Sequence, residues 1–347
     1  MVDKTDFVSA LAAQADNLRV TADVVAQALA SAQLEPWREG ETIAVVAMGA
    51  SSHSGEALTA ALAQIGVRAV NITASDLELS AEGFQPGDHY LVVSESGQSP
   101  EPIRAAAAFT QGRRIGITND PSAPLSSVVD VILPLGGWPD SRVYTSGFTG
   151  TLLAYAALIR HQCPSGNVTD PATIPDVVAS TLGGYGDVAD AAATLLEKVQ
   201  AIDFVARGVS RAAATEGALV VREGARLHAA AYDTYQYIHG PMEPLTADSG
   251  LIVFGDAREL PMVDMVLDRG VKVVLLTSAE TADIRRPNHE NLLVVPAPDA
   301  FTGIARAVLE TVFVQMLTLR LTARSGIDIN EFLFEQPDTK LNERTTQ

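Results

Sequence analysis

Cysteine and basic residues are scarce in this sequence of 347 residues. The single cysteine, Cys163, cannot form a disulfide within the chain and leaves no metal site built from several cysteines. Only 24 lysines and arginines accompany 42 aspartates and glutamates, so the net charge is −18. Nucleic acids and anionic membrane surfaces are bound by clustered Lys and Arg, and we therefore expect neither as a partner.

Long apolar runs are also missing. No stretch reaches the roughly 18–20 uninterrupted apolar residues that a membrane-spanning helix needs. Residues 1–20 lack the basic start and apolar core of a signal peptide, so we expect a cytoplasmic protein. His53 has no second His or acid at metal-binding spacing, and we expect neither a metal nor a cofactor.

Short apolar segments alternate with helical ones along most of the chain. In the first half we predict strands at residues 43–48, 67–75, 89–93, 113–118 and 128–135. Each is a continuous apolar run, and most are separated by segments with helical spacing. Strands that are apolar on both sides and alternate with helices indicate a parallel sheet covered by helices on both faces.

The two halves of the chain repeat each other. Residues 43–51 read IAVVAMGAS and residues 202–210 read IDFVARGVS, which places Gly49 and Gly208 159 positions apart. Thr118 and Thr277 end two further apolar segments with the same separation. A third pair, residues 89–97 and 249–257, deviates from it by one or two positions. We interpret this as a tandem duplication of one α/β unit.

The repeat predicts two doubly wound, flavodoxin-like α/β units, each with a central and mostly parallel sheet. They meet in a region rich in Pro, Gly and Asp. The predicted segments are an N-terminal helical segment (1–34), a first domain (35–165), a second domain (186–335) and a C-terminal tail (336–347).

The first candidate site is the segment SESGQSP, which starts at Ser94 directly after a predicted strand. Ser94, Ser96 and Ser99 surround a glycine, and Pro100 suits the first turn of a helix. A strand end, a glycine turn and a helix start together form a ready anion site. Alternatively, Ser99 only caps the helix and the other serines only line the turn. The matching loop of the second half, FGDARELP, has none of the three serines, which favours an anion site in the first half alone.

A second serine-rich turn, GASSHSG from Gly49, follows the first strand and opens a helix near Gly55. Ligands of open α/β sheets bind at the carboxyl ends of strands, so Ser51, Ser52 and Ser54 can face the same crevice as the first serines. Ordinary turn chemistry also explains this composition.

The third candidate segment runs from Thr215 to the His239-Gly-Pro turn. Residues 215–232 are predicted to be helical, and Glu216 and Glu223 then share a face. Gly224 and Ala225, beside Glu223, allow close approach of another element. An acid and an imidazole on one helix–loop unit suit proton transfer. The alternative is that both acids are solvated.

These segments resemble the sugar isomerase (SIS) domain family. In particular, the chain resembles the isomerase half of glucosamine-6-phosphate synthase and the stand-alone sugar-phosphate deaminases and fructosamine-phosphate deglycases. SESGQS is similar to the family's phosphate loop, and residues 216–241, EGALVVREGARLHAAAYDTYQYIHGP, are similar to its second-half signature. The resemblance implies that a proton is moved between C1 and C2 by Glu223, and that ring opening is assisted by His239. It also implies a homodimer with shared active sites, and a sugar phosphate held by Ser51, Ser94, Ser96 and Ser99.

The chain also departs from the family pattern. Glu95 stands where the family commonly has Gln or Arg, and it is expected either to turn away from a phosphate or to bind a sugar hydroxyl. We count it and Ser52 among the substrate-binding candidates. Three lysine positions of the family fall on Ser146, Val220 and Glu343, with Lys340 three residues before the last.

The resemblance implies an enzyme that acts on a sugar or amino-sugar 6-phosphate. The reaction would be aldose–ketose isomerisation, deamination or deglycation through an enediol or enolamine. The alternative is a non-catalytic sugar-phosphate-binding or sensor protein, which the lost lysines favour. Sensors of this family usually carry one such unit beside a DNA-reading helix-turn-helix, whereas this chain has two units and no basic segment of that kind.

Overall fold

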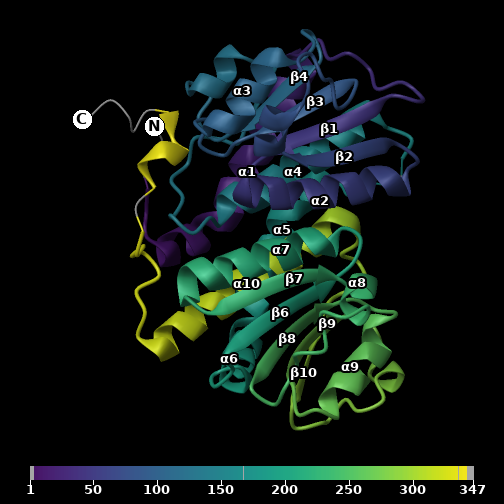
Figure 1. The fold of residues 1–347 in the computed structure, drawn as a ribbon, viewed down its shortest axis with the longest axis vertical. Coiled ribbons are helices and arrows are strands. Elements are labelled where there is room, and N and C mark those ends of the chain that lie inside the picture. Colours follow the sequence, from purple (N-terminus) through teal and green to yellow (C-terminus); the bar gives the residue numbers. More distant parts are fainter. Residues whose placement is uncertain (1–3, 167, 335, 342–347) are drawn as a thin grey trace. The chain divides into compact units, whose positions relative to one another are not determined.

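The computed structural model describes residues 4–166, 168–334 and 336–341, and the chain divides into two compact units (Figure 1). The first unit comprises residues 1–175 and 332–347, and the second comprises residues 176–331. Each has its own five-stranded sheet. Among the described residues, no helix is both long and apolar enough to cross a membrane.

The first unit alternates strands and helices after a long N-terminal helix. Its elements are α1 (Phe7–Ser31), β1 (Thr42–Ala47), α2 (Gly49–Gln64), β2 (Arg68–Thr73), η1 (Ala74–Leu79), β3 (His89–Val93), α3 (Pro100–Ala108), β4 (Arg114–Thr118), η2 (Pro124–Ser127), β5 (Val131–Pro134), α4 (Ser146–Gln162), η3 (Pro171–Thr173) and, near the C-terminus, η6 (Pro337–Thr339).

The sheet of the first unit has the strand order β2-β1-β3-β4-β5, and all pairs are parallel. This is the flavodoxin-like order, in which the chain reverses direction across the sheet between β1 and β3. On one face of the sheet, Val46 and Val92 pack against Ile103 of α3 and against Phe109, the residue that caps the C-terminus of α3. Figure 1 shows α1, α2 and α4 on the other face. The loops after β1 and β3 therefore meet at one edge, with helices leaving in opposite directions.

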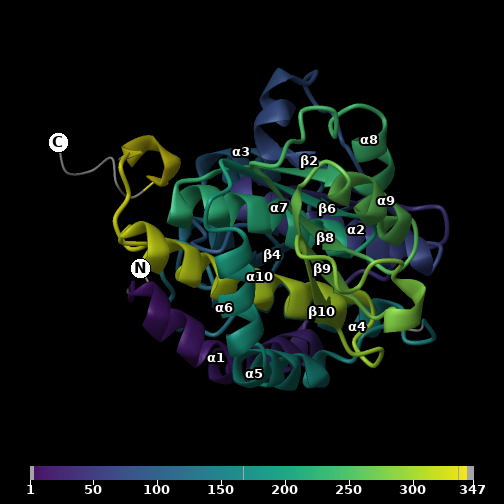
Figure 2. The same cartoon turned by 90° about the horizontal axis from the view of Figure 1, so that it is seen from below.

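The second unit repeats this arrangement, with the order β7-β6-β8-β9-β10 and only parallel pairs. Figures 1 and 2 show α7 and α10 on one face of its sheet and α9 on the other. Its elements are α5 (Ile174–Gly184), which starts at the boundary, α6 (Gly186–Leu195), β6 (Ala201–Ala206), α7 (Ser210–Val220), a π-helical turn (Val221–Ala225), β7 (His228–Asp233), α8 (Thr234–Ile238), β8 (Ser249–Phe254), α9 (Glu259–Leu267), β9 (Lys272–Thr277), η5 (Thr281–Asp283), β10 (Leu292–Pro296) and α10 (Gly303–Ser325).

The prediction of two parallel-sheet α/β units is confirmed. Ile43 and Ile202 are each the second residue of the first strand of their unit. Gly49 and Gly208 both have positive φ, at +52° and +61°, so the turn after that strand is the same in both units. The nine-residue helices α3 and α9 begin 159 residues apart, at Pro100 and Glu259.

The predicted helix over residues 215–232 is wrong. The helix α7 ends at Val220, and β7 then pairs in parallel with β6. The sequence of β7, HAAAYD, is rich in alanine, which favours helix by intrinsic propensity. Pairing along the edge of the sheet overrides that weak preference, and the left-handed Arg226, at φ +53°, separates the π turn from the strand.

Candidate active site

The serine loop (residues 94–99) joins β3 to α3. Its backbone turns at Gly97, whose φ of +64° lies in the left-handed region. A side chain is not tolerated there, because an added Cβ would lie 2.6 Å from Cβ of Ala123. The Gly97 N–H closes the turn by donating to the Ser94 carbonyl at 2.9 Å. The glycine of SESG thus folds the loop back on itself.

The three hydroxyls belong to this one turn. Ser94 Oγ donates to Ser99 Oγ at 3.1 Å and accepts from the Ser99 N–H at 3.4 Å. Ser96 Oγ accepts from the Gln98 N–H at 3.4 Å. Ser99 is the N-cap residue of α3, but its side chain makes no capping hydrogen bond. The simple capping role considered for Ser99 is therefore not observed.

The start of α3 offers few backbone donors to an anion. Pro100 and Pro102 have no N–H group, which leaves Glu101 as the one donor among the first three helical residues. The helix contributes the positive end of its dipole, but side chains must supply most hydrogen bonds to an anion there.

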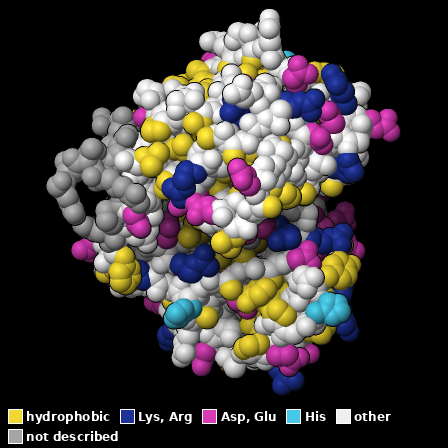
Figure 3. All heavy atoms as spheres, turned by 45° about the horizontal axis from the view of Figure 1, so that its top comes forward, with side chains coloured by type: hydrophobic (Ala, Val, Ile, Leu, Met, Phe, Trp, Pro, Cys, Tyr) yellow, Lys and Arg dark blue, Asp and Glu magenta, His cyan; other side chains and the backbone are white. Residues whose placement is uncertain are grey.

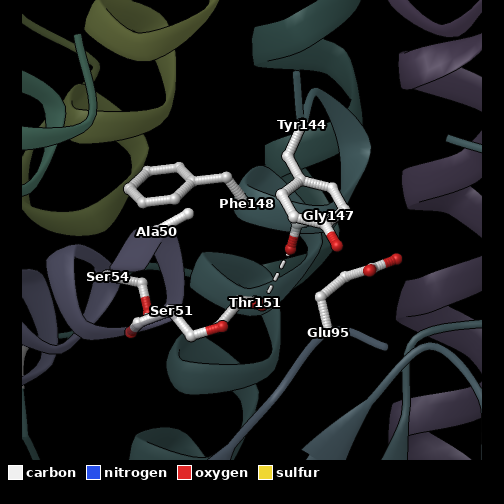
Figure 4. A pocket seen from close by; sticks show the side chains of 8 residues that line it. All are labelled: Ala50, Ser51, Ser54, Glu95, Tyr144, Gly147, Phe148 and Thr151. Atoms are coloured by element: carbon white, nitrogen blue, oxygen red, sulfur yellow. Dashed lines mark hydrogen bonds between the residues drawn. The ribbon is translucent and has the colours of Figure 1, made fainter. Parts of the chain in front are cut away.

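Ser51 lies in the first turn of α2, which begins at Gly49, so the predicted helix start near Gly55 is six residues late. Because β1 and β3 are neighbours, the loops that carry Ser51 and Ser94 reach the same edge of the sheet. A small pocket opens beside this edge (Figure 4). It is lined by Ala50, Ser51, Ser54, Glu95, Tyr144, Gly147, Phe148 and Thr151.

Ser52 is not among the residues that line this pocket. Its carbonyl accepts a hydrogen bond from Asn71 Nδ2 at 2.8 Å, which ties the start of α2 to β2. Ser54 faces inward, with its Oγ donating to the Ser51 carbonyl at 2.6 Å and lying 3.0 Å from the Tyr155 hydroxyl. Of Ser52 and Ser54, it is therefore Ser54 that lines the pocket.

Glu95 lines the pocket with its stem, but its carboxylate points away from Ser51 and Ser54 (Figure 4). The residue is 8% exposed, and Asn119 Nδ2 donates to its Oε1 at 3.1 Å. Gly147 leaves room for this orientation, because an added Cβ would lie 2.8 Å from Glu95 Cγ. Of the two expectations for Glu95, the geometry favours the one in which it turns away.

Asp140 is a part of this site that sequence reasoning missed. Its carboxylate accepts hydrogen bonds from the Thr145 hydroxyl at 2.6 Å and from the Gly147 N–H at 2.7 Å. Complete burial, together with the nearby charge of Glu95, raises the pKa of Asp140 to about 6. This carboxyl group therefore fixes the loop that presents Tyr144 and Gly147 to the pocket.

The second unit fills the position equivalent to the serine loop with its own carboxylate. Glu259, the first residue of α9, is 1% exposed. It accepts hydrogen bonds from Thr234 Oγ1 at 2.6 Å and from the Ala257 N–H at 3.2 Å. Its carboxylate also lies against Gly255, 2.5 Å from where a Cβ would stand. A carboxyl group of the chain itself thus occupies this helix start.

Glu223 lies in the π-helical turn that ends α7, and it is half-buried. Such turns are frequent at functional sites. The adjacent Gly224 packs tightly, since an added Cβ would lie 2.9 Å from Thr318 and 3.0 Å from Ile329. The close approach expected from Gly224 is therefore present, and α10 fixes the turn that carries Glu223.

His239 caps the C-terminus of α8 and is exposed. The helix α8 packs through Tyr237 on the Val205 side of the sheet. The helix α7 instead packs its Gly217 against Phe204, whose side chain faces the other side. Glu223 and His239 thus follow helices on opposite faces of one sheet.

Two of the three lost lysine positions lie within the described residues. Val220 is the last residue of α7 and is buried, and Ser146 begins α4 and accepts a hydrogen bond from Asn17 Nδ2 at 2.9 Å. Glu343 lies outside the described residues. Lys340 lies within them, and its Nζ donates to Ser96 Oγ at 2.8 Å.

The face of the molecule in Figure 3 has no basic surface. Lysine and arginine side chains are scattered among acidic ones there, without a continuous basic patch. Among the described residues, no group of three or more His, Cys, Asp or Glu side chains is arranged to hold a metal ion.

Comparison with known proteins identifies relatives. The SIS domain family model matches residues 195–324. A glutamine–fructose-6-phosphate aminotransferase (isomerizing) of Nostoc sp. (strain PCC 9229) is 25% identical over 330 residues, which cover 84% of this chain and 50% of the relative. The chain thus spans about half the length of the curated relatives it matches.

Solved structures show the same fold over nearly the whole chain. The C-terminal domain of a glucosamine-fructose-6-phosphate aminotransferase from Francisella tularensis has a TM-score of 0.77 at 19% identity, covering 94% of this chain and 98% of that one. A glucosamine-6-phosphate deaminase from Thermotoga maritima has a TM-score of 0.73 at 16% identity, covering 96% and 98%. The chain therefore contains an SIS domain and is homologous to the isomerizing glutamine–fructose-6-phosphate aminotransferases, which confirms the resemblance read from its motifs.

Proposed function

We propose that this protein is an enzyme that acts on the open-chain form of a sugar or amino-sugar 6-phosphate. The reaction is an aldose–ketose isomerisation, or a deamination or deglycation that begins with the same proton transfer. One observation carries the proposal. The hydroxyls of Ser94, Ser96 and Ser99 gather at the start of α3, whereas Glu259 fills the matching place in the second unit. The homology to isomerizing aminotransferases supports it.

In this proposal the phosphate lies at the edge of the sheet between β1 and β3. The serine loop and Ser51 donate hydrogen bonds to its oxygens, and the α3 dipole favours its charge. Glu223 takes a proton from one carbon of the bound sugar and returns it to the neighbouring carbon. A carboxylate suits this role because it can take a carbon-bound proton and return it to the adjacent carbon. His239 opens the sugar ring by general acid–base catalysis.

We further propose a cytoplasmic homodimer in which each active site uses residues of both copies. Glu223 and His239 follow helices on opposite faces of one sheet. His239 is exposed and follows a short helix, so a second copy can receive it. The two SIS domains are proposed to span residues 35–165 and 186–335, between the helical segment 1–34 and the tail 336–347.

A second candidate function is sugar-phosphate binding without catalysis. The replacement of two family lysine positions by Val220 and Ser146 favours it. A binding protein needs the serine loop but not the basicity of Glu223. Replacement of that one carboxylate therefore separates the two functions.

The experiment follows solvent deuterium by NMR into C1 of fructose 6-phosphate and into C2 of glucosamine 6-phosphate, the carbons whose protons the proposed transfer exchanges. We expect the wild type to exchange, and Glu223→Gln to exchange about 10²–10⁴-fold more slowly with little change in KM. Glu197→Gln, the same change at an exposed site of the second unit, serves as the control. Exchange that persists at the wild-type rate in Glu223→Gln contradicts the assigned role. Binding without exchange in the wild type favours the second function.

A further inference from the structure

The C-terminal segment docks directly on the serine loop. The Leu341 N–H donates to the Gln98 carbonyl at 3.1 Å. The Leu341 side chain packs against the apolar cluster on the α3 face of the sheet, which contains Ile103 and Phe109. A backbone hydrogen bond and an apolar anchor thus hold the residue next to Lys340. Ser96 and Lys340 are 244 positions apart in the sequence, yet this docking makes them neighbours.

Lys340 places its ammonium group at the loop. Its Nζ donates to Ser96 Oγ at 2.8 Å, and its side chain is half-buried. Among the described residues, no other lysine or arginine is hydrogen-bonded to Ser94, Ser96 or Ser99. The loop therefore has one cation in direct contact.

The rest of the site has little positive charge. The serine hydroxyls are neutral, and the prolines at the start of α3 remove two backbone donors. Glu95 and Asp140 place carboxyl groups behind the same loop. A phosphate dianion approaching this edge would meet repulsion from them, and a nearby ammonium group offsets it.

We propose that Lys340 is a phosphate-binding residue of this site and makes it select phosphate esters over uncharged sugars. When the phosphate binds, the ammonium group turns from Ser96 to a phosphate oxygen, and the freed Ser96 hydroxyl donates to another. Lys340 then supplies the positive charge at the site, and the serine hydroxyls supply neutral hydrogen-bond donors. This inference rests on the proposed anion site but does not depend on which reaction follows.

The test measures binding of inorganic phosphate to the full chain by calorimetry at low and high ionic strength. Lys340→Gln keeps a side chain that can hydrogen-bond to Ser96 but removes the charge. We expect it to bind phosphate roughly tenfold more weakly at low ionic strength, because hydrogen bonds to charged groups are the stronger ones. That difference shrinks at high ionic strength, where the charge is screened. Lys340→Arg, which keeps the charge, is expected to bind within about threefold of the wild type.

Lysine acetylation followed by mass spectrometry gives a second measurement on the wild type. Phosphate should protect Lys340 from acetylation and leave the exposed Lys198 of the second unit unprotected. Lys198→Gln is the matched control in the binding assay.

Three results would overturn the inference. They are a wild type that binds no phosphate, a Lys340→Gln variant with unchanged affinity at low ionic strength, and a Lys340→Arg variant as weak as Lys340→Gln. If phosphate binding by the wild type and the Lys340 variants is as expected, but no sugar phosphate is turned over, the proposed enzyme activity is refuted and the role of Lys340 is not. If the protein turns over a sugar phosphate but Lys340→Gln binds phosphate as tightly as the wild type, only the role of Lys340 is refuted.

Discussion

Replacement of Asp140 by asparagine tests the electrostatics behind the pocket. Asp140 is 1% exposed and lies near the charge of Glu95. Burial raises its pKa from the ordinary 3.8 to about 6 in the folded protein. The native state therefore holds this proton more tightly than the unfolded chain does. Its contribution to stability is complete below about pH 4 and is lost as the pH rises through 6.

The size of the effect follows from the two pKa values. A difference between 3.8 and about 6 corresponds to roughly 3 kcal/mol of folding free energy. The wild type should lose about that amount between pH 4 and pH 7 through Asp140 alone. The amide that replaces this carboxyl group does not titrate, so the stability of Asp140→Asn relative to wild type should rise by roughly 3 kcal/mol over this range. The constant cost of exchanging an oxygen for an NH₂ group cancels in this comparison.

Urea unfolding followed by tryptophan fluorescence is the appropriate assay. The two tryptophans, Trp37 and Trp138, both belong to the first unit, so the signal reports on the unit that contains Asp140. Glu310, whose pKa burial raises to about 7, belongs to the second unit. The wild type and Asp140→Asn both contain Glu41, whose pKa is lowered to about 2 by hydrogen bonds from Arg38 and His89. Its contribution to the pH dependence therefore cancels in the comparison.

Asp23→Asn makes the same chemical change at an exposed position of α1 and serves as the control. The change in its stability with pH is subtracted from that of Asp140→Asn. If the corrected stability of Asp140→Asn relative to wild type is flat between pH 4 and pH 7, Asp140 does not titrate in this range. That result would refute the conclusion that burial and the charge of Glu95 raise the pKa of the Asp140 carboxyl group.

Two further predictions concern the site and its assembly. Ser96→Ala combined with Ser99→Ala should weaken sugar-phosphate binding about 10–100-fold in a thermal-shift titration, with the unliganded Tm unchanged, because hydrogen bonds to a charged ligand are lost. Unchanged affinity would rule out the serine loop. Light scattering should give twice the 36.5 kDa chain mass, and mixing Glu223→Gln with His239→Asn subunits should restore about one quarter of wild-type activity. A monomer, or a mixture as inactive as its parents, would exclude a shared site.

The strands of the first unit were accessible from the sequence because most buried parallel strands are runs of apolar residues. Residues such as Val45 and Leu275 are fully buried, and apolar side chains are favoured at such positions. The repeat then fixed equivalent positions, since a glycine with positive φ follows the first strand of each unit. The helix boundaries were harder to place. Alanines that read as helix in β7 take part in sheet pairing that only the folded chain provides.

The serines of the candidate site were found because they are local, falling within one turn. Asn119 was missed because its contact with Glu95 joins two separate loops of the sequence. Asp140 was missed because only folding buries it and brings it near the charge of Glu95. Periodicity carries no signal for such pairs. The contact of Lys340 with Ser96 was missed for the same reason, although a lysine in the tail was noticed from the family pattern.

We expect the second unit to bind no phosphate of its own. Glu259 stands 159 positions after Pro100, at the same helix start, and Thr234 and the Ala257 N–H already bind its carboxylate. A helix start satisfied by a buried carboxylate repels a second anion. We therefore expect one phosphate per chain by calorimetry, with the stoichiometry unchanged in Glu259→Gln because the glutamine side chain still fills the position against Gly255. Two phosphates bound per wild-type chain would show that the Glu259 carboxyl group does not block the second unit, and that both units bind phosphate.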